Sequence, residues 1–313
     1  MYYNIFFKIC ILILKHFKKN SKIIIGDMMK KFICLLILLG ITGCSLFKRD
    51  SMENINIITT NYSLEYIIQN LYGENSLVSS IYPDGIDISN YNFTEKQIRD
   101  FSKKDMFIYM GLTKDSTQAV TFLNKNNDIK IIDATYGMQF KYKEDELWLN
   151  PSNLLMIAQN IKNGLGEYIT STYLLKNIDD LYNELKVSLS TLDAEYKTSV
   201  QNANNKTIFT NDDSLLFLEK YDLTVISLDE NNENYEKNLA LFKNYIKNGT
   251  VKHLYVYENT NTTETINEII KDKVETVPFR NLKNITDEER ENDKNYLTIM
   301  YENLENLKKE LYK

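Results

Sequence analysis

The sequence predicts an α/β protein with two lobes, each a mainly parallel sheet flanked by helices, joined by one long backbone helix. Short apolar runs alternate with amphipathic segments over residues 55–133, and the same alternation returns over residues 207–277. Such alternation is typical of parallel sheets that helices cover on both faces. Between the two regions, residues 172–201 contain neither proline nor glycine, as expected for an uninterrupted helix.

The first lobe is predicted from four apolar runs separated by helical segments. Thr94 is a good N-cap residue before one of these helices, and Pro151-Ser152-Asn153 is a start signal for another. The predicted strands are 55–59, 77–81, 105–110 and 129–133, and the predicted helices are 63–71, 94–102 and 154–165.

The long helix is predicted from apolar residues that recur three and four positions apart from Leu174 to Tyr196. The second lobe repeats the architecture of the first, with no repeat in sequence. Its predicted strands are 207–210, 223–228, 253–257 and 275–277, with helices between them and a final helix over 287–311. A ligand should lie between the lobes, at the carboxyl ends of the strands.

The start of the chain reads as a targeting signal. Lys30 and Lys31 precede an apolar run of about nine residues, which is too short for a membrane-spanning helix and fits a secretory signal. The following Ile41-Thr42-Gly43-Cys44 resembles the lipobox of bacterial lipoproteins. The resemblance implies that Cys44 is diacylated and becomes the mature N-terminus; the alternative is a plain signal anchor with an incidental cysteine.

Residues 1–28 resemble a second signal in front of the first. Our hypothesis is that translation begins at Met28 or Met29, since the codons of Gly26-Asp27 can contain a ribosome-binding purine run. An uncleaved precursor that begins at Met1 would refute it. The predicted segments are a mis-assigned upstream stretch (1–28), a lipoprotein signal peptide (29–43), a lipidated tether (44–53), an N-terminal lobe (54–171), a linking helix (172–202) and a C-terminal lobe (203–313).

Composition excludes several function classes. Residues 1–43 hold seven lysines and one acid, so the remainder carries 30 basic and 42 acidic residues, a poor balance for binding nucleic acid. The three cysteines all lie within the first 44 residues, which excludes a zinc finger or a cysteine nucleophile in the folded part. No G-x-S-x-G elbow occurs, and Gly164-Leu165-Gly166 lacks the Lys-Ser/Thr of a phosphate loop. We therefore expect no enzyme.

Several stretches resemble the zinc/manganese family (cluster A-I) of solute-binding lipoproteins of metal ABC importers. Residues 83–91, Pro-Asp-Gly-Ile-Asp-Ile-Ser-Asn-Tyr, are similar to its P-x-G-x-D-P-H-x-Y loop, and residues 146–151, Glu-Leu-Trp-Leu-Asn-Pro, to its H-x-W-L-D-P signature. Residues 94–112, 193–197 and 287–311 resemble further parts of the family, in the same order. The resemblance covers nearly all of residues 53–313 and implies the two-lobed fold.

The metal ligands of that family are not matched. The resemblance places its histidines at Ser89, Glu146 and about Asp212, and its last acid near Arg280. The mature chain has one histidine, His253, inside a strand-like run, where a structural role is expected. A zinc site built on imidazoles is therefore not expected.

Three interpretations of these positions stay open. In the first, Arg280 replaces the metal charge between Glu146 and Asp212, so that the cleft closes on an ion pair or binds a small polar solute. In the second, oxygen ligands form a weak site for manganese, calcium or magnesium. In the third, the side chains are simply solvated. The oxygen-ligand set is Asp87, Ser89, Glu146, Asp212 and Asp213.

The resemblance implies an extracytoplasmic, lipid-anchored solute-binding component of an ABC importer, with an altered or degenerate ligand site. Its partners would be a permease and an ATPase, its ligand a divalent metal (zinc or manganese) or a small polar solute, and its anchor the membrane. The alternative is a surface lipoprotein with an adhesion or interaction role that has lost metal transport.

Overall fold

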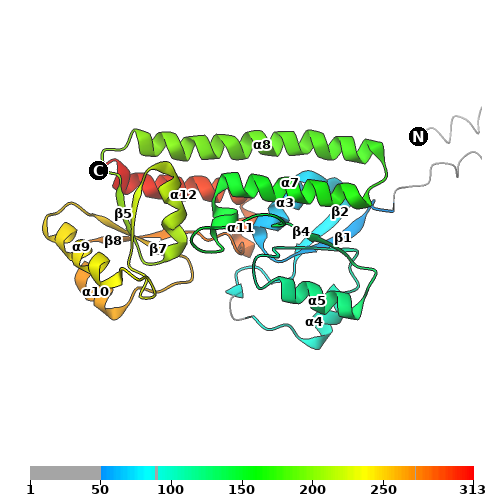
Figure 1. The fold of residues 1–313 in the computed structure, drawn as a ribbon, viewed down its shortest axis with the longest axis horizontal. Coiled ribbons are helices and arrows are strands. Elements are labelled where there is room, and N and C mark those ends of the chain that lie inside the picture. The colour runs from blue at the N-terminus through cyan, green and yellow to red at the C-terminus, as the bar shows by residue number, and fades with distance from the viewer. Residues whose placement is uncertain (1–50, 89–90, 272) are drawn as a thin grey trace, which may run out of the picture. The chain divides into compact units, whose positions relative to one another are not determined.

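The computed structural model of the chain describes residues 51–88, 91–271 and 273–313, which fold around two parallel sheets (Figure 1). The first sheet has the strand order β2-β1-β3-β4 and the second β6-β5-β7-β8, with every neighbouring pair parallel. The predicted fold class is confirmed. The strands are β1 (Ile55–Thr59), β2 (Ser76–Ser80), β3 (Met106–Tyr109), β4 (Lys130–Asp133), β5 (Thr207–Thr210), β6 (Thr224–Ser227), β7 (His253–Tyr257) and β8 (Glu275–Phe279).

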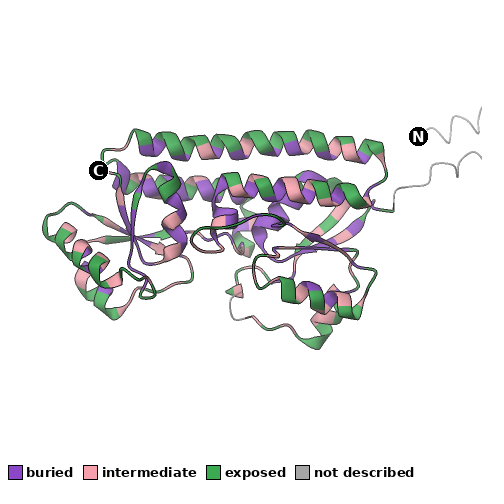
Figure 2. Cartoon of the chain, viewed as in Figure 1, coloured by how far each residue is buried: buried purple, intermediate pink, exposed green. Residues whose placement is uncertain are grey.

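Helices cover both sheets, and their buried positions face the interior while their exposed positions face outward (Figure 2). None of the helices in the described part of the chain has the length and apolar composition needed to cross a bilayer. The helices are α3 (Tyr62–Tyr72), α4 (Glu95–Phe101), α5 (Ser116–Lys125), α6 (Glu146–Leu149), α7 (Pro151–Tyr168), α8 (Thr172–Gln201), α9 (Tyr235–Lys247), α10 (Glu264–Ile270), α11 (Asp287–Glu291) and α12 (Tyr296–Leu311), with 3₁₀ segments η2 (Gly73–Asn75) and η4 (Asp213–Tyr221).

The two sheets share one topology. In the first, the chain leaves β1 for β2 on one side and then returns past β1 to β3 on the other; β5, β6 and β7 repeat this path. The order of strands therefore reverses at β1/β3 and at β5/β7. Crevices that hold ligands form outside the carboxyl ends of strands at such points.

The long helix α8 has the bounds that the sequence predicts, and in Figure 1 it extends beside both sheets. Its first turn is capped by Ser171, whose hydroxyl accepts a hydrogen bond from the backbone N–H of Leu174 (3.3 Å). Its apolar stripe packs against α7 and α12. The hydroxyl of Tyr196 also donates to the carbonyl of Met300 in α12 (2.8 Å). The helix is thus attached along its length rather than free in solvent.

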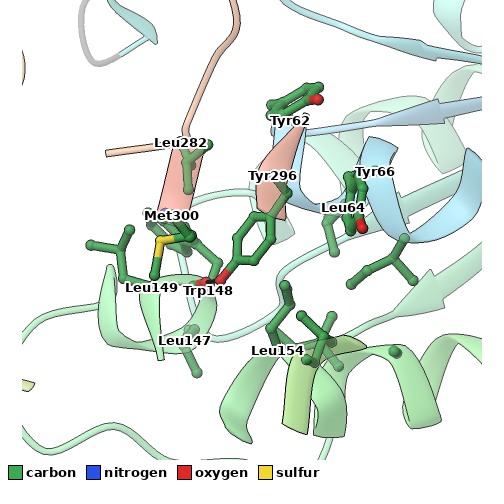
Figure 3. Packing of buried hydrophobic residues seen from close by; sticks show 14 of the residues in the cluster. Tyr62, Leu64, Tyr66, Leu147, Trp148, Leu149, Leu154, Leu282, Tyr296 and Met300 are labelled. Carbon is green, nitrogen blue, oxygen red and sulfur yellow. Dashed lines mark hydrogen bonds between the residues drawn. The ribbon is translucent and has the colours of Figure 1, made fainter. Parts of the chain in front are cut away.

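A shared core joins elements of both lobes (Figure 3). The rings of Tyr66 in α3 and Tyr296 in α12 stack with centroids 5.5 Å apart. The Tyr296 hydroxyl donates to the carbonyl of Trp148 in α6 (2.7 Å), and the Trp148 indole N–H donates to the carbonyl of Asn281 after β8 (2.7 Å). These bonds satisfy buried polar atoms and fix the segments around the cleft.

The prediction of a single final helix over 287–311 is wrong, because the structure has α11 and α12 with a break between them. Two local signals cause the break. Thr286 and Glu289 form a capping box that starts α11, and Asn295 caps α12 with its side chain. Between them Asp293 adopts a left-handed φ of 53°, a conformation that a continuing helix does not allow.

Two further helix predictions differ from the structure. Helix α7 begins at Pro151 rather than at 154, because Asn150 is the cap and accepts a hydrogen bond from the Ser152 N–H (3.1 Å). Helix α5 was not predicted. Only Ala119 and Phe122 are buried along its ten residues, so its apolar stripe is too sparse to recognise in the sequence.

Gly164 of α7 is required by close packing against β4, and Gly166 two residues later is not. A Cβ at Gly164 would lie 2.7 Å from Cγ2 of Ile132, whereas a Cβ at Gly166 would meet nothing closer than Cδ2 of Leu175 at 3.9 Å. We expect Gly164→Ala to lower the free energy of unfolding by about 1–2 kcal/mol. The control Gly166→Ala should raise it by up to about 1 kcal/mol, because alanine favours helix. Urea unfolding measures both, and equal effects would contradict the packing.

Candidate functional site

A polar cavity of about 190 Å³ lies where the carboxyl ends of strands from both sheets meet. Loops after β2, β5, β7 and β8 line it, together with the segment before α6. This is the location expected from the strand order. The charged lining residues are Asp87, Lys143, Asp145, Asp212, Glu258, Arg280 and Lys283.

Lys143 connects the two lobes at this cavity. It precedes α6, and its ammonium group lies 2.9 Å from Asp212 Oδ1 after β5 and 2.8 Å from Asp229 Oδ2 after β6. Burial alone would lower the pKa of Lys143, but the hydrogen bonds to both carboxylates outweigh burial and raise the pKa. Burial likewise opposes the charge of Asp229, yet its bonds to Lys143 and Asn231 lower the pKa of Asp229 below its usual value. Lys143 and Asp229 are therefore charged at neutral pH.

Asp145 makes a second connection across the cavity. Its side chain is 5% exposed and lies 2.9 Å from the ammonium group of Lys283, which follows β8. The hydroxyl of Tyr257, at the end of β7, also donates to Asp145. Burial, together with the charge of Asp145, raises the pKa of Tyr257 far above its usual value, so Tyr257 stays a donor.

Arg280 pairs within its own lobe. Its Nε lies 2.8 Å from Glu258 Oε1, and its Nη2 donates to Glu289 Oε2 (3.1 Å). The backbone of Arg280 is fixed by the buried amide of Asn303, which accepts from its N–H (2.9 Å) and donates to its carbonyl (3.0 Å). Because two carboxylates hold its guanidinium and Asn303 holds its backbone, Arg280 cannot easily exchange partners.

Arg290 provides a third connection between the lobes, beside the cavity. Its guanidinium donates to both carboxylate oxygens of Glu65 in α3 (2.7 and 3.1 Å) and to Asp84 (3.0 Å). Glu65 is 2% exposed, and burial raises its pKa even though Arg290 opposes that rise. Its charge therefore depends on Arg290.

The residues that the sequence indicated are only partly brought together. Asp87, Asp212 and Arg280 line the cavity, but Arg280 lies with Glu258 and Glu289 rather than between Glu146 and Asp212. Glu146 closes the loop before α6 instead, because its carboxylate accepts from the backbone N–H groups of Lys141 (2.9 Å) and Tyr142 (3.2 Å).

Three other predicted positions lie away from the cavity or outside the described residues. Asp213 accepts a hydrogen bond from the side chain of Asn232 (2.8 Å). Ser89 and Cys44 are outside the residues that the structure describes. His253 lies at the start of β7, its Nδ1 2.8 Å from the buried carboxylate of Glu310. This contact fits the structural role expected for it.

Sequence reasoning missed Lys143, Asp145, Glu258 and Lys283. A signal for the first two was present, because Lys143-Glu144-Asp145 is a charged run directly before a buried Trp motif. In the described residues, no group of three or more His, Cys, Asp or Glu side chains is arranged to hold a metal ion. Ammonium or guanidinium groups instead hold the carboxylates of Glu65, Asp145, Asp212, Asp229, Glu258 and Glu289.

We expect Lys143→Met to lower the free energy of unfolding by about 1–2 kcal/mol near neutral pH. The reason is that Asp212 and Asp229 then face each other without the ammonium group, and solvent screens their repulsion only in part. The folded-state pKa of Asp229 is depressed, so its stabilising contribution is present above its unfolded pKa. That contribution is lost as the pH falls through the folded value. The deficit of the variant should therefore shrink in acid, as urea unfolding at several pH values would measure.

The control is Lys162→Met, which removes an ammonium group from an ion pair with the exposed Asp179 on α8 (2.6 Å). We expect it to cost less than about 1 kcal/mol. A Lys143→Met deficit that stays constant down to about pH 3 would contradict the assigned role.

Comparisons with known proteins agree with this fold. A metal ABC transporter substrate-binding lipoprotein of Lactococcus lactis is 26% identical over 307 aligned residues, covering 90% of this chain and 96% of the relative. The manganese ABC transporter substrate-binding lipoprotein PsaA of Streptococcus pneumoniae is 27% identical over 217 residues, covering 63% of this chain and 68% of PsaA.

Among solved structures, the Zn(II)-bound ZnuA-like domain of Streptococcus pneumoniae AdcA superposes with a TM-score of 0.68 at 20% identity, covering 83% of this chain and all of that domain. The family described as ZnuA, zinc-uptake complex component A, periplasmic, matches residues 57–310. The resemblance seen in the sequence is thereby confirmed, and the chain belongs to the ZnuA family.

Proposed function

We propose that this chain is the extracytoplasmic solute-binding component of an ABC importer of the zinc/manganese class, with a ligand site altered by internal cations. Family membership and the relatives named as metal-importer lipoproteins support the importer role. The observation that carries the altered site is the contact of Lys143 with both Asp212 and Asp229.

The charges of the cavity decide how a metal could enter. A divalent ion between these carboxylates would have to displace the ammonium group of Lys143, to which both already bond. The carboxylates that face the cavity offer oxygen ligands, which suit manganese, calcium or magnesium better than zinc. The metal in this proposal is cargo, and any capture requires the lobes to exchange one set of ion pairs for another.

Export, a lipid anchor and two partner subunits complete the proposed importer. Residues 29–43 would direct export, and a diacylated Cys44 would hold the folded part at the outer surface of the membrane. The chain itself would perform no catalysis. A permease would receive the solute and an ATPase would supply the energy.

Metal binding tests the altered site. In isothermal titration of the full chain in detergent, we expect Mn²⁺ and Zn²⁺ to bind weakly to the wild type. Mn²⁺ should bind about tenfold more tightly to Lys143→Met, because the competing ammonium group is gone. Lys162→Met, which removes a lysine on α7 outside the cavity lining, should behave as the wild type. Tight binding by the wild type that Lys143→Met does not change would refute the altered site.

Reconstitution tests the importer role separately. The permease and ATPase that this proposal assigns to the chain, placed in liposomes, should hydrolyse ATP faster when the purified chain is added, because docking of the loaded binding protein drives the cycle. Arg290→Met, which leaves Glu65 without its cation and loosens the lobes, should reduce this stimulation. If the wild type neither stimulates the ATPase nor co-purifies with the permease, the adhesion or interaction alternative is favoured.

A further inference from the structure

A second cavity, of about 300 Å³, lies at the carboxyl edge of the first sheet. Thr60 and Asn61 follow β1 and Asp115 follows β3, so the cavity occupies the point at which the strand order of this sheet reverses. Its volume is at the lower end of the range for sites that bind small molecules. It is distinct from the cavity at Lys143 and shares with it only Ile88 and Lys283.

Asp115 has an unusual position at this cavity. It is the N-cap residue of α5, where an aspartate side chain ordinarily accepts a hydrogen bond from the first turn. Here the side chain makes no such bond and lines the cavity. The backbone of Asp115 is already helical, and its N–H donates to the Thr113 hydroxyl (3.2 Å), so its carboxylate is not needed as the cap. The carboxylate lies instead beside Thr60 and Thr113 at the cavity.

The charge of Asp115 is poorly compensated. Burial raises its pKa to about 6, although Thr60, Thr113 and the backbone of Met110 partly offset the effect. Burial also raises the pKa of Glu144, the other acid of the lining. Within the described residues neither acid has an ion pair shorter than 4 Å. Lys283, which also lines the cavity, is paired instead with Asp145 at 2.9 Å. Lys114 is a lining residue too, and together with Lys283 it partly compensates the charge of Glu144. A cation placed beside Asp115 would be stabilised chiefly by that carboxylate.

Thr60 adds a polar atom that has no well-formed hydrogen bond within the fold. The residue is 1% exposed, and its hydroxyl lines the cavity without a hydrogen bond of normal geometry. Buried hydroxyls are ordinarily bonded, because an unbonded one costs free energy. A ligand group beside Asp115 could bond to it.

Aromatic and apolar side chains also line the cavity. Tyr82 and Tyr91 meet edge to face with centroids 5.7 Å apart, and Met110 is fully buried beside the cavity. One ammonium group already lies against this lining, since Lys283 Nζ is 5.5 Å from the ring centre of Trp148. Aromatic faces stabilise cations as well as apolar groups.

We propose that this cavity binds a small organic cation, with a primary ammonium group between Asp115 and Thr60 and an apolar body against Tyr82 and Tyr91. The proposal goes beyond metal import. It requires no permease, and it holds whether or not the cavity at Lys143 takes a metal.

Isothermal titration of the full chain in detergent with 2-phenylethylamine tests the proposal, and 2-phenylethanol serves as the uncharged probe of the same carbon frame. The amine should bind saturably and the alcohol should not. Asp115→Asn, which keeps the shape but removes the charge, should weaken amine binding by about tenfold or more. Asp128→Asn removes an exposed charge from the same lobe and should leave amine binding unchanged.

Thr60→Val gives a second measurement if Asp115→Asn fails to fold, as circular dichroism would reveal. It keeps the volume and removes the hydroxyl, and should weaken binding of the amine. The proposal is overturned if the amine gives no saturable heat, if amine and alcohol bind equally, or if the folded cavity variants bind the amine as the wild type does. These outcomes would leave ATPase stimulation by the chain unaffected, so failure here is distinguishable from failure of the importer role.

Discussion

The ammonium group of Lys143, held between Asp212 and Asp229, is the contact on which the chemistry of the cleft depends. Two carboxylates at the ends of neighbouring strands would repel each other without a cation nearby. In this chain the cation comes from the opposite lobe, so the same contact neutralises the site and connects the halves. Two further ion pairs connect the lobes in the same way, Lys283 with Asp145 and Arg290 with Glu65.

The packing around the cleft makes this arrangement possible. The stacked rings of Tyr66 and Tyr296 and the hydrogen bonds of Trp148 form a core to which both lobes contribute, and α8 packs alongside α7 and α12. With the strand ends fixed by this core, side chains from two sheets meet at distances of about 3 Å. The family fold is thereby retained while the charges inside the cleft differ from those of a histidine metal site.

Much of the fold could be predicted from the sequence because it depends on local patterns. The strands are short apolar runs, and α8 follows its spacing of apolar residues without interruption. The break before α12 was missed although its signals are local, namely the capping residues Thr286 and Asn295. The site was harder to predict. Asp212 and Arg280 could be placed at strand ends, but their partners are set by tertiary packing: Glu146 bonds to backbone, and Lys143 reaches across the cleft.

The most direct test of the central claim is X-ray diffraction at the zinc and manganese absorption edges, from crystals of this protein grown with each ion. The account predicts no anomalous peak between Asp212 and Asp229, and density for the Lys143 ammonium group between these two carboxylates. A strong peak at that place, with Lys143 turned away from Asp212, would contradict it.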